Sequence, residues 1–219
     1  MPQLPDSGFD HVASFYDPLA RLVFRDAQLR AQMVLLPFIE DNTRVLIAGG
    51  GSGWLLQQLL NTGKQLHILY LDASPKMIEM AERRNRQQLT QSYASVEFRV
   101  GTEQAILPAE TFDYIVTPFL LDLFPERRLE KLMRRLNQAM AQNGKWLFAD
   151  FWPARQPAPW WQKLLLKAMY IFFGLLSNVE AGHLPNFNHH FATLELKESY
   201  SANFYRGMIQ AKVFSRQMV

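Results

Sequence analysis

The chain of 219 residues contains no cysteine, which excludes disulfide bonds, thiolate metal sites and a cysteine nucleophile. An excess of charge is also lacking: the net charge is +3, which is too small to indicate nucleic-acid binding by itself. The N-terminal sequence has no basic start followed by an apolar stretch, so it shows no signal peptide. We therefore expect a cytoplasmic protein without disulfide bonds.

One stretch organises the chain: VLIAGGGSGWLLQQLL, residues 45–60. An apolar run ends in a glycine-rich turn, and a helical pattern begins directly after it. A strand, turn and helix of this kind bring the backbone close to a nucleoside ligand at a helix N-terminus. A second apolar run, 66–71, ends in Asp72, whose carboxylate can accept hydrogen bonds from both hydroxyls of a ribose.

The remaining pattern alternates strands with helices, which predicts right-handed crossovers and a mostly parallel sheet. Residues 194–216 form two alternating runs around a loop with Asn203 and Gly207, which predicts an antiparallel hairpin that closes the sheet. The fold class is thus a doubly wound, Rossmann-like α/β domain with a seven-stranded sheet. The other predicted strands are 43–49, 66–72, 96–100, 112–116 and 146–150, and the predicted helices between them are 53–62, 75–86 and 125–140.

Two segments flank this core. Residues 9–39 have helical spacing with a break at Asp17-Pro18, which predicts two N-terminal lid helices. Residues 158–180 are very apolar, but polar and charged residues and Gly174 interrupt them, so we do not expect a membrane-spanning helix. This segment either packs on the domain and closes a pocket, or dips into a membrane interface with Trp160 and Trp161 at the headgroups.

A chain of this length and of ordinary composition, with 48% hydrophobic residues, can bury a full core as one domain. We therefore predict a single domain over 1–219. Its four parts are N-terminal lid helices at 1–40, a ligand-binding core at 41–151, an apolar cap insertion at 152–190 and a closing hairpin at 191–219.

The predicted helix 125–140 is amphipathic, and Asn143-Gly144 is interpreted as its end. Its basic face, which we interpret as a solvated surface rather than an anion site, carries Arg127, Arg128, Lys131, Arg134 and Arg135. The histidines at 183, 189 and 190 have no i, i+4 spacing and no clustered acid, so no metal site is predicted. One pair of them could instead face a binding pocket and supply a base near neutral pH.

Four stretches, taken in order, resemble those of class I S-adenosylmethionine-dependent methyltransferases. The resemblance is greatest to the small-molecule branch that includes quinone and lipid methyltransferases, and it covers roughly 9–151. The stretches are VLIAGGGSG, YLDASPKMIEMAERR, FDYIVTPFLLDLF and AQNGKWLFADF, and the opening FDHVASFYDPLA resembles the helix ahead of them. The resemblance implies S-adenosylmethionine as cofactor and a small-molecule methyl acceptor. The apolar segment 158–180 and the mildly basic net charge suggest that this acceptor is hydrophobic.

The glycine spacing separates this family from dinucleotide-binding oxidoreductases. Those enzymes use G-x-G-x-x-G, and Trp54 stands where the third glycine of that pattern would be. The chain also departs from the methyltransferase pattern. Ile47 replaces the acid two positions before the first glycine, and Thr102 replaces the acid after the third strand. A non-catalytic S-adenosylmethionine-binding protein and an NAD(P)-dependent oxidoreductase therefore stay open as alternatives.

The resemblance also implies the site residues. We expect the cofactor to contact Gly49, Gly50, Gly51, Gly53, Asp72, Ala73, Met77, Thr102, Glu103 and Thr117. The candidate catalytic residues are Asp122, after the fourth strand, and Tyr16, from the N-terminal helices. With Ile47 in place of an acid, the amino group of the methionine moiety would bind main-chain carbonyls at Gly49 and Thr117, or a side chain such as Tyr16.

Methyl transfer from a sulfonium is an in-line displacement, so a general base is required only if the acceptor must lose a proton. The sequence disfavours a nucleic-acid acceptor. It has no cysteine for pyrimidine-C5 methylation, and Thr117-Pro118-Phe119-Leu120 lacks the Asn/Asp-Pro-Pro-aromatic motif of amino-methylating enzymes. We therefore predict a small-molecule acceptor. Peripheral membrane contact through 158–180 stays open as an alternative to packing on the domain, and the sequence does not predict the oligomeric state.

Overall fold

The computed structural model describes residues 24, 26–88, 93–153, 159–162, 164–165, 167 and 184–216. The part of the predicted lid helices that precedes Phe24, with Tyr16, and most of the apolar segment 158–180 lie outside the described residues. The described part of the lid contains the helix α2, Ala27–Met33.

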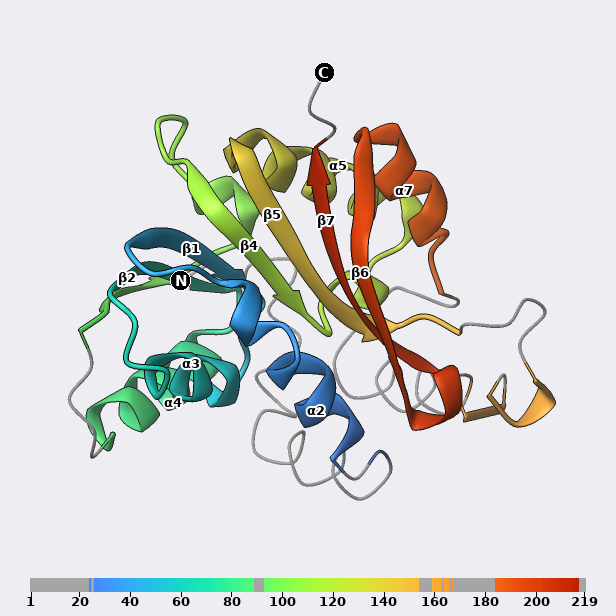
Figure 1. Cartoon of the computed structure of the whole chain (residues 1–219), viewed down its shortest axis with the longest axis horizontal. Helices are drawn as coiled ribbons and strands as arrows, with labels where there is room; N and C mark the ends of the chain where they lie inside the picture. The colour runs from blue at the N-terminus through green and yellow to red at the C-terminus, as the bar shows by residue number, and fades with distance from the viewer. Residues whose placement is uncertain are drawn as a thin grey trace.

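A seven-stranded sheet forms the centre of the molecule, in the order β3-β2-β1-β4-β5-β7-β6 (Figure 1). Strands β1 to β5 pair in parallel, and β7 runs antiparallel to both β5 and β6. The predicted fold class and the closing hairpin are therefore confirmed. The strands are β1 Thr43–Ala48, β2 Leu66–Asp72, β3 Ser95–Val100, β4 Phe112–Pro118, β5 Met140–Phe151, β6 Leu196–Phe204 and β7 Ile209–Arg216.

Helices cover both faces of the sheet. Alternate side chains of β1 divide between two cores: Val45 and Ile47 pack with α2, α3 and α4, whereas Leu46 and Ala48 pack with α5 and α7. Figure 1 shows α3 and α4 beside β1 and β2, and α7 beside β6. The helices are α2 Ala27–Met33, α3 Trp54–Leu60, α4 Pro75–Arg86, α5 Glu126–Ala139 and α7 Phe187–Thr193.

The sequence explains where two of these helices begin and pack. The Ser74 side chain accepts a hydrogen bond from the Met77 amide at 3.1 Å, and Pro75 occupies the first position of α4. Helix α5 buries the predicted apolar stripe, of which Leu129 and Leu136 are fully buried. In the described part of the chain, no helix is long and apolar enough to cross a membrane.

The predicted boundary between α5 and β5 is wrong. Asn143 and Gly144 do not end the helix; α5 already ends at Ala139, and both residues lie within β5. The pairing of β4 with β5 is irregular, since Phe112 pairs with Met140 but Tyr114 pairs with Lys145. The polar residues between Met140 and Lys145, which the sequence pattern predicted as a turn, lie in this irregular part of the strand.

Candidate active site

The predicted site residues that the structure describes lie at or near the carboxyl ends of β3, β2, β1 and β4, which are consecutive neighbours in the sheet, and β5 lies next to β4. The glycine turn 49–53 follows β1, Asp72 ends β2, residues 119–122 follow β4, and Asp150 lies at the end of β5. In open α/β sheets, ligands bind outside this edge.

The glycine turn requires glycine for two reasons. Gly49, Gly51 and Gly53 have φ angles of +66°, +63° and +85°, which other residues adopt only with strain. At Gly50, a Cβ atom would lie 2.3 Å from the Tyr70 ring, whereas a Cβ atom on Gly51 would meet nothing within 4 Å. The turn is thus packed closely at Gly50 and leaves space beside the backbone of Gly51.

Asp72 holds this turn in place. Its Oδ2 accepts a hydrogen bond from the Gly51 amide at 2.9 Å, and its Oδ1 accepts one from the Ser74 amide at 2.9 Å. The Tyr70 hydroxyl donates to the Gly51 carbonyl at 2.8 Å. A carboxylate can accept about four hydrogen bonds, so these contacts are compatible with a ribose on the same side chain.

Three other predicted cofactor contacts lie close by. Ala73 follows Asp72 directly and is half-buried. Met77 is buried in the first turn of α4. The Thr117 hydroxyl is fully buried and accepts a hydrogen bond from the Trp146 indole at 2.9 Å. The hydroxyl of Thr117 therefore has a structural partner, so only its main chain stays a candidate ligand group.

The structure gives Glu103 a different role from the expected one. Its buried carboxylate forms a bidentate ion pair with Arg128 of α5, with distances of 2.9 and 2.6 Å. Because this pair takes both oxygens, we propose no cofactor contact for the Glu103 side chain. The neighbouring Thr102 caps the short helical turn η3, Glu103–Ala105.

Asp122 lies in a second acidic group that the sequence did not predict, because its partner is Asp150, a buried side chain at the end of β5. The two carboxyl groups are hydrogen-bonded to each other. Burial raises the pKa of Asp122 to about 6. Burial and the neighbouring Asp122 raise the pKa of Asp150 well above its ordinary value. The pair thus keeps a proton under mildly acidic conditions.

Asp150 also fixes the segment after β4. Its Oδ2 accepts hydrogen bonds from the amides of Leu121 at 2.9 Å and Asp122 at 3.3 Å. The Phe119 amide donates to the Ala149 carbonyl at 2.7 Å, although Phe119 has a φ angle of +52°. Such strained positions persist only where the surrounding structure enforces them, and they cluster at functional sites.

This segment reaches the glycine turn. A Cβ atom on Gly49 would lie 2.6 Å from Cδ1 of Leu120, so the two residues are in direct contact. The end of β5 therefore holds residues 119–122, and these in turn cover Gly49.

Aromatic side chains from distant segments meet at the same edge. Phe119 and Phe151 lie 5.5 Å apart between ring centroids, and Phe24 lies 4.9 Å from Phe151 and 5.2 Å from Tyr205. Trp161 contacts Tyr205 at 6.4 Å. The N-terminal segment, the strand ends, the apolar segment and the hairpin turn thus contribute to one aromatic cluster.

The histidines do not form a metal site within the described residues. His183 lies outside them. His190 is buried and its Nε2 contacts the carboxylate of Glu126 on α5, whereas His189 is exposed. The His190 imidazole thus already has a carboxylate partner on α5, and the role of a histidine as a base stays a prediction.

Residues 45–144 match the family model of methyltransferase domains. The demethylmenaquinone methyltransferase of Thermotoga maritima is 28% identical over 148 residues, which cover 66% of this chain and 60% of that protein. Polyamine aminopropyltransferase 2 of Bacillus anthracis is 28% identical over 150 residues, 62% of this chain and 41% of that protein. The matches thus span less than two thirds of either relative.

Solved structures share the fold. Magnesium protoporphyrin IX methyltransferase from Synechocystis PCC 6803, solved with bound S-adenosylhomocysteine, has a TM-score of 0.71 at 14% identity. The alignment covers 96% of this chain and 98% of that one. The N-methyltransferase NodS from Bradyrhizobium japonicum has a TM-score of 0.64 at 15% identity, with 89% and 88% covered.

We expect the substitution Asp122→Asn to reduce the loss of stability at higher pH. A carboxyl with a raised pKa stabilises the fold fully below its ordinary value of 3.8, and this contribution is lost as the pH rises through about 6. That shift corresponds to about 3 kcal/mol. An asparagine can donate its amide N–H to Asp150 without titrating. Urea unfolding from about pH 4 to about pH 8 measures the difference.

The matched control is Asp41→Asn, since the Asp41 carboxylate accepts a hydrogen bond from the Gln65 amide at an exposed site. It should leave the pH dependence of unfolding as in the unmodified protein. If the Asp122→Asn variant loses as much stability over the same pH range as the unmodified protein, the pKa of Asp122 is not raised in the folded state.

Proposed function

Because the chain carries a class I S-adenosylmethionine-dependent methyltransferase domain, we propose that it transfers a methyl group from this cofactor to a small, hydrophobic acceptor. One observation carries the proposal. The glycine turn after β1 is hydrogen-bonded to the carboxylate of Asp72 at the end of β2, beside open space at Gly51. A nucleoside can approach the backbone there while its ribose hydroxyls meet the acid.

The cofactor would lie along the carboxyl ends of β2, β1 and β4. Asp72 would accept the ribose hydroxyls, and the glycine turn would admit the sulfonium end close to the backbone. On the adenine side we propose Ala73, Met77 and Thr102. Strand β1 contains no acidic residue and Ile47 is completely buried, so no acid serves the methionine amino group from β1. Main-chain carbonyls at Gly49 and Thr117 would take that role, with Tyr16 proposed from the N-terminal segment.

When bound, S-adenosylmethionine supplies an electrophilic methyl group on a sulfonium. The protein's part is to hold the acceptor in line with that group and to exclude water. The aromatic cluster around Phe119 and Phe151 would do both. Where the acceptor must lose a proton, we propose Asp122 as the base, since a pKa of about 6 suits proton transfer near neutral pH.

The surroundings of this edge support the proposed acceptor class. The rings of Phe24, Phe119 and Phe151 are buried and make this edge apolar rather than charged, which favours a hydrophobic molecule. Similarity to a demethylmenaquinone methyltransferase supports a small-molecule acceptor. The net charge of +3 gives no support for a nucleic acid.

We also propose that residues 1–219 act as one domain in which the lid and the cap insertion close the acceptor side. Phe24, within the predicted lid segment, packs against Phe151 and Tyr205. Trp161, in the cap insertion, packs against Tyr205, and the Gln162 side chain donates to the Arg206 carbonyl at 3.2 Å. Both flanking segments therefore contact the edge at which the cofactor would bind.

The alternatives differ in what they need. An NAD(P)-dependent oxidoreductase would need a glycine where Trp54 begins α3, and the antiparallel β7 differs from the parallel sheet of that fold. A non-catalytic cofactor-binding protein is favoured by one observation, the absence of an acid at Ile47.

Calorimetric titration separates these functions. We expect S-adenosylmethionine and S-adenosylhomocysteine to bind the protein and NAD not to bind. Turnover on a panel of hydrophobic phenols, quinols and lipids should then identify an acceptor class. Binding of NAD alone would overturn the proposal. Cofactor binding without turnover on any acceptor would favour the non-catalytic alternative.

Asp72→Ala should weaken binding of S-adenosylhomocysteine by about 1–3 kcal/mol, because hydrogen bonds to a charged group are lost. The same titration measures this change. Asp113→Ala is the control: Asp113 lies at the opposite end of β4, where its carboxylate accepts a hydrogen bond from the Arg44 amide, and it should not change the affinity. Unchanged affinity in a folded Asp72→Ala variant would place the ribose elsewhere.

We further propose that the exposed side of the segment 159–167 contacts a membrane interface. Trp160 and Leu164 are 77% and 61% exposed and have i, i+4 spacing, whereas Trp161 and Leu165 pack against the core. Lys167, also exposed, would lie among the headgroups.

We expect the protein to sediment with vesicles that contain anionic lipid, and the double variant Trp160→Ser and Leu164→Ser to stay largely in solution. Met33→Ser, at another exposed apolar residue, is the control and should sediment like the unmodified protein. If the unmodified protein stays in the supernatant, this contact does not exist.

A further inference from the structure

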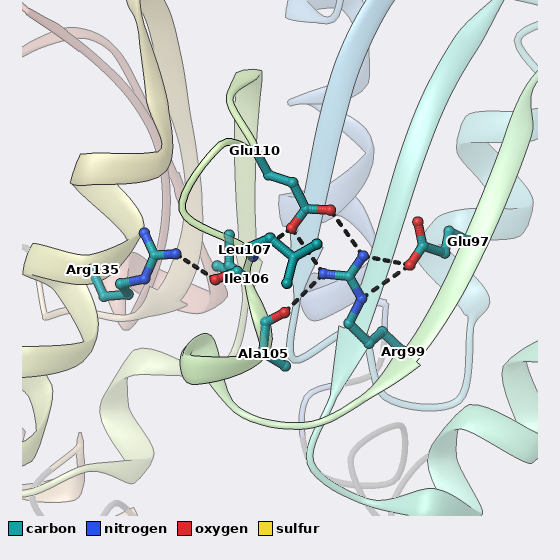
Figure 2. Close-up of polar contacts among 7 residues, drawn as sticks. All are labelled: Glu97, Arg99, Ala105, Ile106, Leu107, Glu110 and Arg135. Atoms are coloured by element: carbon teal, nitrogen blue, oxygen red, sulfur yellow. Dashed lines mark hydrogen bonds and ion pairs between the residues drawn. The ribbon is translucent and has the colours of Figure 1, made fainter.

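The connection between β3 and β4, residues 102–110, is fixed by arginines from two sides. It contains only one short helical turn, η3, yet side chains of β3 and α5 bind both its carboxylates and its carbonyls. Figure 2 shows Arg99 on one side of this connection and Arg135 on the other.

Arg99 of β3 binds the connection at two points, in its middle and at its end. Its guanidinium donates to the two carboxylate oxygens of Glu110 at 2.8 and 2.9 Å and to the Ala105 carbonyl at 2.8 Å (Figure 2). Glu110 also accepts a hydrogen bond from the Leu107 amide at 2.7 Å. The side chains of Arg99 and Glu110 are only 19% and 16% exposed, so this pair is more than a surface contact. The guanidinium lowers the pKa of Glu110 below its ordinary value.

Two arginines of α5 bind the connection from the other side. Arg128 forms the bidentate pair with Glu103, whose side chain is 3% exposed. Arg135 donates to the Ile106 carbonyl. We interpreted the basic face of α5 as a solvated surface. Two of its arginines, Arg128 and Arg135, instead bind groups of the connection between β3 and β4.

The connection is joined to the proposed ribose site. Asp72 and Val100 are paired at the ends of β2 and β3, and the Gly101 amide donates to the Asp72 carbonyl at 2.9 Å. Residues 102–105 follow directly. Loss of Arg128 would leave the buried carboxylate of Glu103 without its charge partner, and the connection would have to move to hydrate it.

We propose that Arg128 and Arg99 are positioning residues for the cofactor, because they hold residues 102–110 as a preformed wall beside the adenosine half of the site. This inference rests on the proposed function. A wall that is already ordered spares the cofactor the entropic cost of ordering it on binding.

The test compares Arg128→Met, Arg128→Lys and the control Arg134→Met by titration with S-adenosylhomocysteine. Arg134 lies on the same helix and pairs with Glu130 at 2.7 Å on the exposed surface. We expect Arg128→Met to raise the Kd by about tenfold, Arg128→Lys to restore part of the affinity, and Arg134→Met to have no effect. Once an acceptor is identified, kcat at saturating cofactor should stay within about twofold.

Hydrogen exchange without cofactor gives a second readout. Amides of residues 102–110 should exchange faster in Arg128→Met than in the unmodified protein, and saturating cofactor should restore their protection. If Arg128→Met does not fold, Arg99→Lys, which loses the two-pronged contact with Glu110, is expected to give the same pattern.

The outcomes separate the two proposals. If the unmodified protein binds neither S-adenosylmethionine nor S-adenosylhomocysteine, the proposed function falls and this inference falls with it. If the unmodified protein binds and a folded Arg128→Met variant binds equally well, only the positioning role is overturned. A variant with unchanged Kd and reduced kcat would also overturn it.

Discussion

The hydrogen bond from the Gly51 amide to the Asp72 carboxylate is the interaction on which the candidate site depends. It joins the turn after β1 to the end of β2, and the Tyr70 hydroxyl supports it from the same strand. The turn needs three residues with positive φ, so it can form only from glycines without strain. The Asp72 side chain thus helps to preorganise this turn for the proposed cofactor.

A second constraint acts at β4 and β5, where two carboxyl groups are buried together. Burial raises the pKa values of both carboxyl groups, and the neighbouring Asp122 raises that of Asp150 further, so the pair keeps a proton. In return, Asp150 accepts hydrogen bonds from the amides of residues 121, 122 and 151. These bonds hold the strained backbone at Phe119 against the glycine turn.

The sequence predicted the parts of this site that depend on local patterns. Apolar periodicity and the glycine run were sufficient for the alternation of strands and helices and for the turn, and the position of Asp72 at a strand end followed from spacing. Asp150 and the Arg128–Glu103 pair were missed, because each depends on which side chains meet after folding. Asp150 belongs to the stretch AQNGKWLFADF. Its position at the end of a predicted parallel strand could have indicated that it lies at the ligand-binding edge of the sheet.

The two halves of the proposed site are therefore built differently. The cofactor half consists of strand ends and backbone groups, such as the glycine turn that Asp72 holds. Strand ends and a glycine run have a clear pattern in the sequence. The acceptor half consists of Phe24, Phe119, Phe151, Trp161 and Tyr205, which come from five separate segments. Aromatic residues in such segments have the pattern of ordinary core residues, so only the fold shows that they converge. Acceptor specificity would thus change through these segments while the glycine turn and Asp72 stay fixed.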